Sequence, residues 1–376
     1  MKQKELSGRK VRRTLKNLIE KIPFKLRILG VVSVICLLFI GLLSMIQQQM
    51  QKNLYDQQMA KRWSGEGGVS QISVFYTEGA VEDSLSFQGT AQSIENALKQ
   101  ASIVNEKEHA RLWIDAFSRS GEIILSTQRA EVEINALGVG GEFFQFHPQK
   151  MVTGATFHAD SMMQDGIVID KETAWQLFGS FDVSGMQVMI GSVPHYITGV
   201  IERPTGRLAE AAGLDHSICF LSMESLENYG TVRGGYTYEI VLPNPIKGFA
   251  YSAVQTAVGM ENDNVILVEN NKRYQFLSLI NVIRQFGVRS MSFKEIVYPY
   301  WENIARGYED IFAMCLLVKI ILLMAPVMFV IAGIMYIWNK KTWTFTMGIT
   351  RIQDKIYESG SRRVQKKQRK KGGEKK

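Results

Sequence analysis

The sequence is poor in the residues that build disulfide frameworks and metal sites, with three cysteines and five histidines among 376 residues. Cys36 and Cys315 lie in or beside apolar runs, so Cys219 stands alone in the rest of the chain and no pairing is expected. The histidines show neither an HExxH motif nor a zinc-type spacing with cysteine. His147 and His158 are the pair best placed to meet in space, but we expect both to lie in solvated loops. The sequence therefore predicts neither a disulfide nor a metal site.

Catalytic motifs are also lacking. The chain has no GxxxxGK[ST] phosphate loop, which excludes a recognisable ATPase, and no GxSxG elbow for a nucleophilic serine. Residues 138–141 (GVGG) are followed by Glu142 and Phe143, where a phosphate loop has Lys and a hydroxyl residue, so they are predicted to form a turn. A surface hydrolase is left without a nucleophile motif. We expect no enzymatic activity and no cofactor, and we expect any chemistry to come from a partner.

Two long apolar runs are what the sequence does contain. Residues 28–46 are 19 residues without a charge, enough to cross a hydrocarbon layer ~30 Å thick as a helix. A cleaved signal peptide is the competing interpretation, but its apolar region would be shorter, and no small-residue cleavage site follows before the glutamines at 47–49. Residues 28–46 are therefore predicted to form the first transmembrane helix.

The second run, residues 311–338, is interrupted only by Lys319, and residues 320–338 are free of charge. At the outer boundary Lys319 can lay its methylene stem along the apolar helix while the ammonium reaches the headgroups. The alternative is a charge inside the membrane or at a helix interface that serves a transport pathway. Pro326 removes one helical hydrogen bond and predicts a kink in this second transmembrane helix.

Charge is distributed unevenly around these runs. Before Ile28 there are ten Lys and Arg against two Glu, and after Trp338 there are thirteen against three acidic residues. The stretch 47–310 between the runs has 20 basic and 31 acidic residues, a net charge of −11. Because basic flanks stay in the cytoplasm, both termini are predicted to be cytoplasmic and the acidic middle extracytoplasmic, with the protein in the cell membrane.

Both basic ends have features of their own. In the segment 1–27, apolar residues recur at helical spacing from Val11 to Ile22 among basic ones, which predicts an interfacial helix under the inner leaflet; a solvated basic arm is the alternative. In the segment 339–376, residues 362–371 (RRVQKKQRKK) follow a membrane helix, where anionic lipid is a nearer partner than nucleic acid. A tail that only sets the topology is the other interpretation.

The extracytoplasmic part is predicted to be one α+β domain held on helical stalks. Residues 47–63 are polar and free of Gly and Pro, so the first membrane helix is expected to continue outward as a stalk; residues 292–310 form the matching stalk into the second. Between them, residues 64–291 mix strand and helix signals without βαβ repetition, and the dipeptide Ser120-Gly121 indicates a turn between two strands. A β-rich subdomain of about residues 139–230 is expected to be inserted in an outer subdomain. The expected strands are 72–76, 110–117, 122–126, 166–169, 187–190, 196–201, 236–242 and 265–268, and the expected helices are 90–103, 171–177 and 248–258.

The order of short apolar strands and glycines over residues 138–202 resembles the periplasmic core domain of MacB-type, FtsX-related ABC permeases. Gly179, Gly185 and Gly191 fall where turns need positive φ, and the apolar positions fill the strands between them. The residues that carry the resemblance are Gly141, Phe143, Phe144, Phe146, Val152, Gly154, Phe157, the run 166–170, Ala174, Leu177, Phe178, Gly179, Val183, Gly185, Val188, Ile190, Gly191, Ile197, Gly199 and Val200.

A second resemblance lies at residues 347–355 (MGITRIQDK), which is similar to the segment that follows the second membrane helix in these permeases and contacts the ATPase. Gly348, Thr350, Arg351 and Gln353 carry it. The family's preceding Arg-Glu-Ile-Gly step is absent, and such permeases continue into two further membrane helices where this sequence has its charged tail. The resemblance implies a permease-like subunit, reduced after its second membrane helix, whose outer domain is coupled to a separate ATPase.

Two functions follow from these patterns. The first is a permease-like membrane subunit that works with an ABC ATPase and a partner permease in a larger complex, for export or for transmission of movement to the outer domain. The second is a membrane-anchored extracytoplasmic binding or sensing module without a transport role, whose acidic surface would suit cationic peptides or metal ions. The substrate is not indicated by the sequence.

Overall fold

The fold is given by a computed structural model, which describes residues 23–65, 68–103, 111–158, 162–259, 264–287, 292–293 and 296–340. Its contacts divide the chain into two units, one of residues 1–44 with 318–376 and one of residues 45–317. The predicted N-terminal interfacial helix and the basic tail lie outside the described residues, apart from the few that border the membrane helices.

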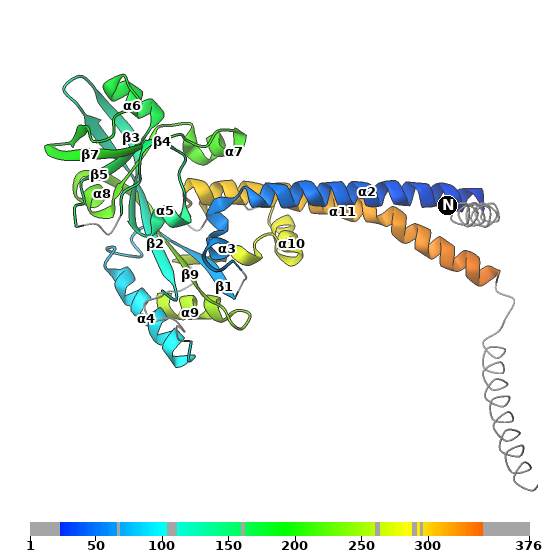
Figure 1. The fold of residues 1–376 in the computed structure, drawn as a ribbon. Helices are drawn as coiled ribbons and strands as arrows, with labels where there is room; N and C mark the ends of the chain where they lie inside the picture. The colour runs from blue at the N-terminus through cyan, green and yellow to red at the C-terminus, as the bar shows by residue number, and fades with distance from the viewer. Residues whose placement is uncertain are drawn as a thin grey trace, which may run out of the picture. The chain divides into compact units, whose positions relative to one another are not determined.

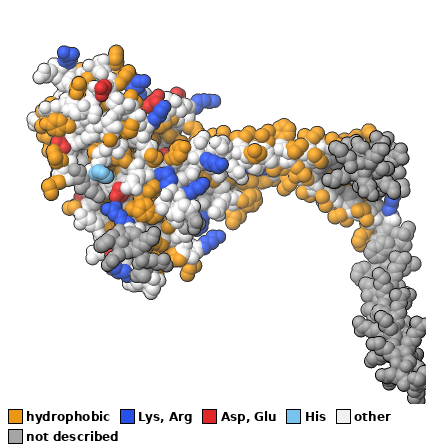
Figure 2. Space-filling model, viewed as in Figure 1, with side chains coloured by type: hydrophobic (Ala, Val, Ile, Leu, Met, Phe, Trp, Pro, Cys, Tyr) orange, Lys and Arg blue, Asp and Glu red, His pale blue; other side chains and the backbone are white. Residues whose placement is uncertain are grey.

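The first unit holds the apolar parts of two helices, α2 (Phe24–Lys52) and α11 (Tyr300–Asn339), which are long and apolar enough to cross a membrane. The hydroxyl of Ser33 donates to the carbonyl oxygen of Ala325 at 3.1 Å, and a Cβ added to Gly30 would lie 3.0 Å from the ring of Phe329. Small residues thus allow the two backbones to approach. Apolar side chains cover the outer surfaces of this pair (Figure 2), as expected of helices in lipid.

The second unit is built on one mixed sheet of ten strands within the described residues (Figure 1). The strand order is β10-β1-β9-β2-β3-β8-β5-β7-β4, with β6 paired to β2 and β7. The pairs β3–β8 and β5–β7 are parallel and the other pairs are antiparallel. The strands are β1 (Val69–Tyr76), β2 (Ile114–Ser126), β3 (Glu131–Gly141), β4 (Met151–Gly154), β5 (Gly166–Asp170), β6 (Gln187–Ile190), β7 (Val193–Ile201), β8 (Ile218–Ser222), β9 (Thr231–Pro243) and β10 (Val265–Glu269).

Short helices accompany this sheet, and a two-stranded ribbon of β11 (Ser292–Phe293) and β12 (Ile296–Val297) lies apart from it in the strand pairing. Figure 1 shows α4 and α9 at one end of the sheet and α6 and α8 at the other. The remaining elements are η1 (Tyr55–Gln57), α3 (Met59–Ser64), α4 (Ser86–Gln100), α5 (Phe143–Phe146), α6 (Lys171–Phe178), α7 (Arg207–Ala209), η2 (Glu210–Leu214), α8 (Met223–Tyr229), α9 (Phe249–Val258), η3 (Asn270–Lys272) and α10 (Phe276–Arg284).

Helix α6 shows how local sequence fixes these elements. The side chain of Asp170 accepts a hydrogen bond from the backbone N–H of Thr173 at 2.7 Å and so begins the helix. Gly179 ends it with φ at 67°. Gly185 and Gly191 have φ at 82° and 61°, so the positive φ predicted for these three glycines is confirmed.

The α+β fold is confirmed, and three large core clusters pack on the sheet, one of which holds Phe143, Val168 and Trp301. Strands β1, β9 and β10 with helices α4 and α9 enclose a core around Ile94, Tyr238 and Val254. The middle of the chain, with β5, β6, β7 and α6, encloses another core around Ile167, Ile169 and Leu177. The chain thus leaves the first of these cores, builds the other and returns, while the long strands β2 and β9 carry one sheet through both.

The turn predicted at Ser120-Gly121 is wrong, because β2 passes through it as one strand with a bulge between Arg119 and Ser120. A Cβ on Gly121 would lie 2.6 Å from the carbonyl oxygen of Thr231, so this glycine serves close packing within the sheet. Residues 138–141, also predicted to form a turn, belong to β3. Gly140 faces Phe117 of β2, whose ring occupies the space where a Cβ would stand.

The predicted stalks are also corrected. Helix α2 ends at Lys52 and does not run to Trp63, since η1 and α3 follow as separate elements with Leu54 and Met59 buried. Residues 292–297 form the β11–β12 ribbon, and the helix starts only at Tyr300. The first turns of α11 bury Trp301 and Phe312 against the domain. The folded unit therefore extends beyond the predicted range 64–291, because the apolar faces of both supposed stalks are covered by it.

Candidate functional site

A network of polar and charged side chains, all buried except the partly exposed Asp56, lies where η1, the sheet and the first turns of α11 meet. We call it the junction network; it consists of Asp56, Ser73, His147, Glu239, Asn270, Arg273, Glu302 and Glu309. Because buried charges are costly unless they are paired and hydrogen-bonded, the arrangement of these groups is the strongest functional signal in the described part of the chain.

His147 is the centre of one half of the junction network. It follows α5 at the helix C-terminus, and its side chain is fully buried. Its Nδ1 lies 2.9 Å from a carboxylate oxygen of Asp56, and its Nε2 bonds the carboxylate of Glu239. Burial alone lowers the pKa of His147, but the charge of Glu239 and the hydrogen bonds to Asp56 and Glu239 outweigh this and raise the pKa to about 9. The imidazolium can therefore donate to both carboxylates at neutral pH.

The ring of Trp301 covers His147, with 4.1 Å between ring centroids and an interplanar angle of 37°. Trp301 is 2% exposed and belongs to the core that also holds Phe143 and Phe146. A positively charged imidazole over an indole face gains a cation–π attraction. The first turn of α11 thus contacts His147 through a tilted ring pair as well as through ordinary apolar packing.

Arg273 is the centre of the other half. Its Nη1 donates to Glu302 at 2.7 Å, its Nη2 donates to the other oxygen of that carboxylate, and its Nε donates to Glu309. Glu302 and Glu309 are seven residues apart on α11, two helical turns, so both face the same side. Burial lowers the pKa of Arg273, but the two carboxylates raise it well above its ordinary value. Burial raises the pKa of Glu302, and Arg273 opposes that change.

Asn270 and Ser73 join the two halves. Arg273 donates to the amide oxygen of Asn270 at 3.1 Å, and the amide nitrogen of Asn270 donates to the hydroxyl of Ser73 at 2.8 Å. Ser73 in turn donates to Glu239 at 2.7 Å. These hydrogen bonds follow one another without a gap, so a continuous hydrogen-bonded path runs from Asp56 on η1 to Glu309 on α11.

The sheet positions this path. Ser73 on β1 and Glu239 on β9 are register partners, so their side chains lie on the same face. Ile72 of β1 is paired with Glu269 at the end of β10, which places the next residues, Asn270 to Arg273, over that face. Loss of one member of a buried ion pair typically costs ~3–5 kcal/mol, because it leaves the other charge buried and unpaired, so α11 and the sheet depend on each other's charged groups.

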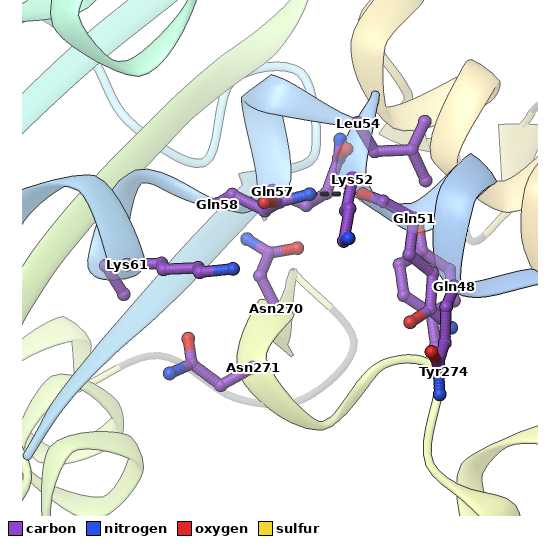
Figure 3. Close-up of a pocket in the computed structure, with 11 residues that line it drawn as sticks. Gln48, Gln51, Lys52, Leu54, Gln57, Gln58, Lys61, Asn270, Asn271 and Tyr274 are labelled. Atoms are coloured by element: carbon purple, nitrogen blue, oxygen red, sulfur yellow. Dashed lines mark hydrogen bonds between the residues drawn. The ribbon is translucent and has the colours of Figure 1, made fainter. Parts of the chain in front are cut away.

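A pocket of about 370 Å³ opens beside the junction network (Figure 3). Its walls come from the last turns of α2, from η1 and α3, and from the loop that contains Asn270 and Asn271. The side-chain amide of Gln58 donates to the carbonyl oxygen of Gln51 and joins two of these walls. The lining residues are Gln48, Gln51, Lys52, Leu54, Gln57, Gln58, Ala60, Lys61, Asn270, Asn271 and Tyr274.

The residues singled out from the sequence lie elsewhere. Gly348, Thr350, Arg351 and Gln353 are outside the described residues, so their role as ATPase contacts stays a prediction. Lys319 lies half-buried in α11, and its proposed position at the membrane boundary also stays a prediction. Within the described ranges, no group of three or more His, Cys, Asp and Glu side chains is placed to hold a metal ion.

Sequence reasoning missed the junction network. The solvated position that the sequence predicts for His147 is wrong, because Asp56, Glu239 and Trp301 enclose the side chain. The only signal in the sequence was the pair of Glu residues seven apart just before the second apolar run. Cys219 is fully buried in β8, because both faces of that strand are covered, so it cannot report topology by labelling of the folded protein.

Comparison with known proteins gives a family match over residues 28–257, to the MacB-like periplasmic core domain. The chain is 29% identical over 76 residues to the macrolide export ATP-binding/permease protein MacB of Chromobacterium violaceum, which covers 20% of this chain and 12% of that protein. It is 33% identical over 84 residues to the protein of the same name in Photorhabdus laumondii, covering 22% and 13%. The matched segment thus spans about an eighth of the length of these curated relatives.

Solved structures of similar regions are more distant. The periplasmic region of MacB from Actinobacillus actinomycetemcomitans matches with a TM-score of 0.39 and 12% identity, covering 59% of this chain and 95% of that one. The extracellular domain of the noncanonical ABC-type transporter YknZ from Gram-positive bacteria matches with a TM-score of 0.33 and 14% identity, covering 53% and 99%.

Proposed function

From the premise that this chain belongs to the MacB-like periplasmic core domain family, we propose that it is a permease-like membrane subunit of an ABC transporter complex. Its two apolar helices anchor it, and its α+β domain lies on the extracytoplasmic side. A separate ATPase supplies the energy, and the domain receives movement of the membrane helices. This role accounts for the lack of any nucleotide-binding loop in the sequence.

The junction network is the observation that carries the proposal. Movement of α11 reaches the sheet through the two-point contact of Arg273 with Glu302 and through the ring contact of Trp301 with His147. On the other side, Asp56 of η1 holds the same histidine. Packed interiors respond to displacement as discrete rearrangements, so rigid attachment of this kind favours transmission of movement over independent motion of helix and domain.

The orientation belongs to the same proposal. Both termini lie in the cytoplasm, because the flanks of the two apolar helices carry net positive charge and the residues between them are net negative. Residues 347–355, after α11, then lie on the side where an ATPase binds. Gly348, Thr350, Arg351 and Gln353 are the residues that contact it.

A partner permease completes the assembly. The apolar helices of the described residues expose almost only apolar side chains, which suits lipid or another helix and does not line a polar pathway. A second membrane subunit, or further copies, would pack against these apolar surfaces. The basic termini lie against anionic headgroups of the inner leaflet.

Affinity purification tests this proposal. The tagged protein, extracted from its own membranes in a mild detergent, is expected to bring down an ABC ATPase and a longer permease, identified by mass spectrometry. A variant with Gly348, Thr350 and Arg351 replaced by alanine should lose the ATPase and keep the permease, whereas Arg363→Ala in the basic tail should keep both. Recovery of the protein without any ABC ATPase would contradict the proposal.

A binding module without transport is the second candidate function. It is favoured by an apolar pocket of about 510 Å³ beside α6, where Trp175 and Phe181 are exposed with their ring centroids 5.4 Å apart. Lys171 lies over the ring of Phe181 and Arg203 borders the same pocket. If the protein is a passive anchor, the triple alanine change at residues 348, 350 and 351 should cause no loss of activity. If it is a coupled subunit, the same change should reduce its activity.

A further inference from the structure

The pocket beside the junction network has the composition of a site for an anionic group. Lys52 ends α2 and Lys61 lies in α3, and Figure 3 shows both ammonium groups pointing into the space between them. Neither lysine forms an ion pair with any residue that the structure describes, although acidic residues outnumber basic ones in this part of the chain. The two cations therefore remain available to a ligand.

Amide groups provide the rest of the lining. Gln48, Gln51, Gln58 and Asn271 reach the pocket from two sides, and side-chain amides donate hydrogen bonds as well as accept them. Two lining groups are left without partners inside the protein. Gln57 is 7% exposed and its Oε1 has no hydrogen bond, and the buried hydroxyl of Tyr274 has none either. Both atoms lie beneath the surface of the lining, so the lysines and the other amides carry the argument for a ligand.

The place of the pocket along α2 identifies the ligand class. Gln48 and Lys52 follow the last apolar residue of the span, Ile46, by two and six residues. At a helical rise of ~1.5 Å per residue this is ~3–9 Å beyond the apolar segment, and a headgroup layer is roughly 5–8 Å thick. Part of the pocket wall thus lies at the depth where phospholipid phosphates are found.

We propose that this pocket binds a phosphate group, and that the phosphate belongs to the headgroup of an anionic phospholipid in the outer leaflet. Lys52 and Lys61 neutralise the phosphate charge, and the side-chain amides of Gln48 and Gln51 donate hydrogen bonds to its oxygens or to the polar headgroup, while the amide of Asn271 is held by Val69 and Gln71. A lipid held there would tie the end of α2 to α3 and to the loop of Asn270, next to the junction network. The inference goes beyond the proposed function, and only the choice of the outer leaflet rests on the orientation proposed there; the lipid site itself requires only that α2 crosses the membrane.

Native mass spectrometry of the full chain in a neutral detergent tests the site, with phosphatidylglycerol and diacylglycerol as probes. Phosphatidylglycerol is expected to bind in preference to diacylglycerol. The variant Lys52→Gln with Lys61→Gln should weaken phosphatidylglycerol binding by roughly tenfold or more, because each lysine near such a charge contributes ~1 kcal/mol. The control variant Lys99→Gln with Lys247→Gln removes the same charge from exposed positions away from the pocket and should bind as the unchanged protein does.

One further variant and one competition measurement complete the test. Gln48→Glu places a carboxylate in the lining at an exposed residue and should also weaken phosphatidylglycerol binding, without the loss of either lysine. Inorganic phosphate distinguishes the sources: if it displaces phosphatidylglycerol, the site recognises free phosphate as well, and if it does not, the lipid headgroup is needed. Equal binding by the Lys52/Lys61 and Lys99/Lys247 variants, at equal thermal unfolding midpoints, would overturn the proposal, as would equal binding of diacylglycerol by the unchanged protein.

Discussion

Arg273 and Glu302 meet in a two-point ion pair in which both side chains are almost fully buried, 2% and 4% exposed. The arginine comes from the loop after β10 and the glutamate from the first turns of α11, so the pair attaches the helix to the sheet. Planar two-point contacts of this kind fix orientation as well as distance, because two parallel bonds resist rotation. The second carboxylate, Glu309, extends the same attachment by two helical turns.

Replacement of Arg273 by methionine should destabilise the domain strongly. Glu302 and Glu309 would remain buried without their cation, and loss of one partner of a buried pair costs ~3–5 kcal/mol. Thermal and urea unfolding of the full chain in detergent measure the change. Arg284→Met, an exposed arginine at the end of α10, is the matched control and should change stability by less than about 0.5 kcal/mol.

The carboxylates themselves provide a check on this explanation. If Arg273→Met acts through uncompensated charge, then adding Glu302→Gln and Glu309→Gln should restore much of the lost stability, since a neutral polar group is far less costly to bury than a charge. A triple variant that is less stable than Arg273→Met would show that packing of the arginine stem, and not charge, carries the effect.

The stability of the domain should depend on pH through His147. Its folded-state pKa is about 9 against an ordinary value of 6.5, so the folded protein holds the proton more tightly than the unfolded chain. The resulting stabilisation, on the order of 3 kcal/mol, is fully present below pH 6.5 and is lost as the pH rises to 9. Urea unfolding at several pH values in this window measures the slope.

His147→Gln should remove most of that slope and leave the protein less stable at neutral pH, because Glu239 and Asp56 lose their shared cation. His158→Gln, at an exposed position, should leave the slope as it is. An unchanged slope in His147→Gln would mean that another group titrates in this range.

Gly140→Ala should destabilise the domain where β2 and β3 pair. The added methyl group would stand 2.1 Å from the ring of Phe117, the register partner of Gly140 on β2. Overpacking typically costs ~1–3 kcal/mol, and Phe117→Leu should relieve part of it. A double-mutant cycle measures the coupling of the two changes. Gly89→Ala in α4, where nothing lies within 4 Å of the added carbon, is the control and should be neutral or slightly stabilising.

The sequence predicted local elements well where they rest on neighbouring residues. The strand over 166–169 and the helix that follows it are marked by a β-branched run, the capping Asp170 and the terminal Gly179. The sequence pattern gave wrong predictions where residues distant in the chain determine the local structure. Ser120-Gly121 has the composition of a turn, but Gly121 is needed because Thr231 and Leu226 fill the space above it. Residues 138–141 were misread for the same reason.

The junction network was beyond the reach of sequence patterns. Its members come from η1, β1, the end of α5, β9, the loop after β10 and α11, and the pairing is set by strand register and not by spacing. Ser73 meets Glu239 only because β1 and β9 pair in that register. Composition indicates the net charge of the region, but it does not indicate which of its 31 acidic residues are buried.

The orientation of the chain can be tested with introduced cysteines. Cys219 is fully buried, so its accessibility depends on unfolding and not on the side of the membrane. Leu85 is 65% exposed in the domain, and Lys340 is an exposed residue at the end of α11. In a background with Cys36, Cys219 and Cys315 replaced by serine or alanine, Leu85→Cys should react with a small membrane-impermeant thiol reagent in intact cells. Lys340→Cys should react only after lysis if the basic flank beyond α11 lies in the cytoplasm, as we propose. The reverse pattern would place the acidic domain inside the cell and contradict both the orientation and the coupling role built on it.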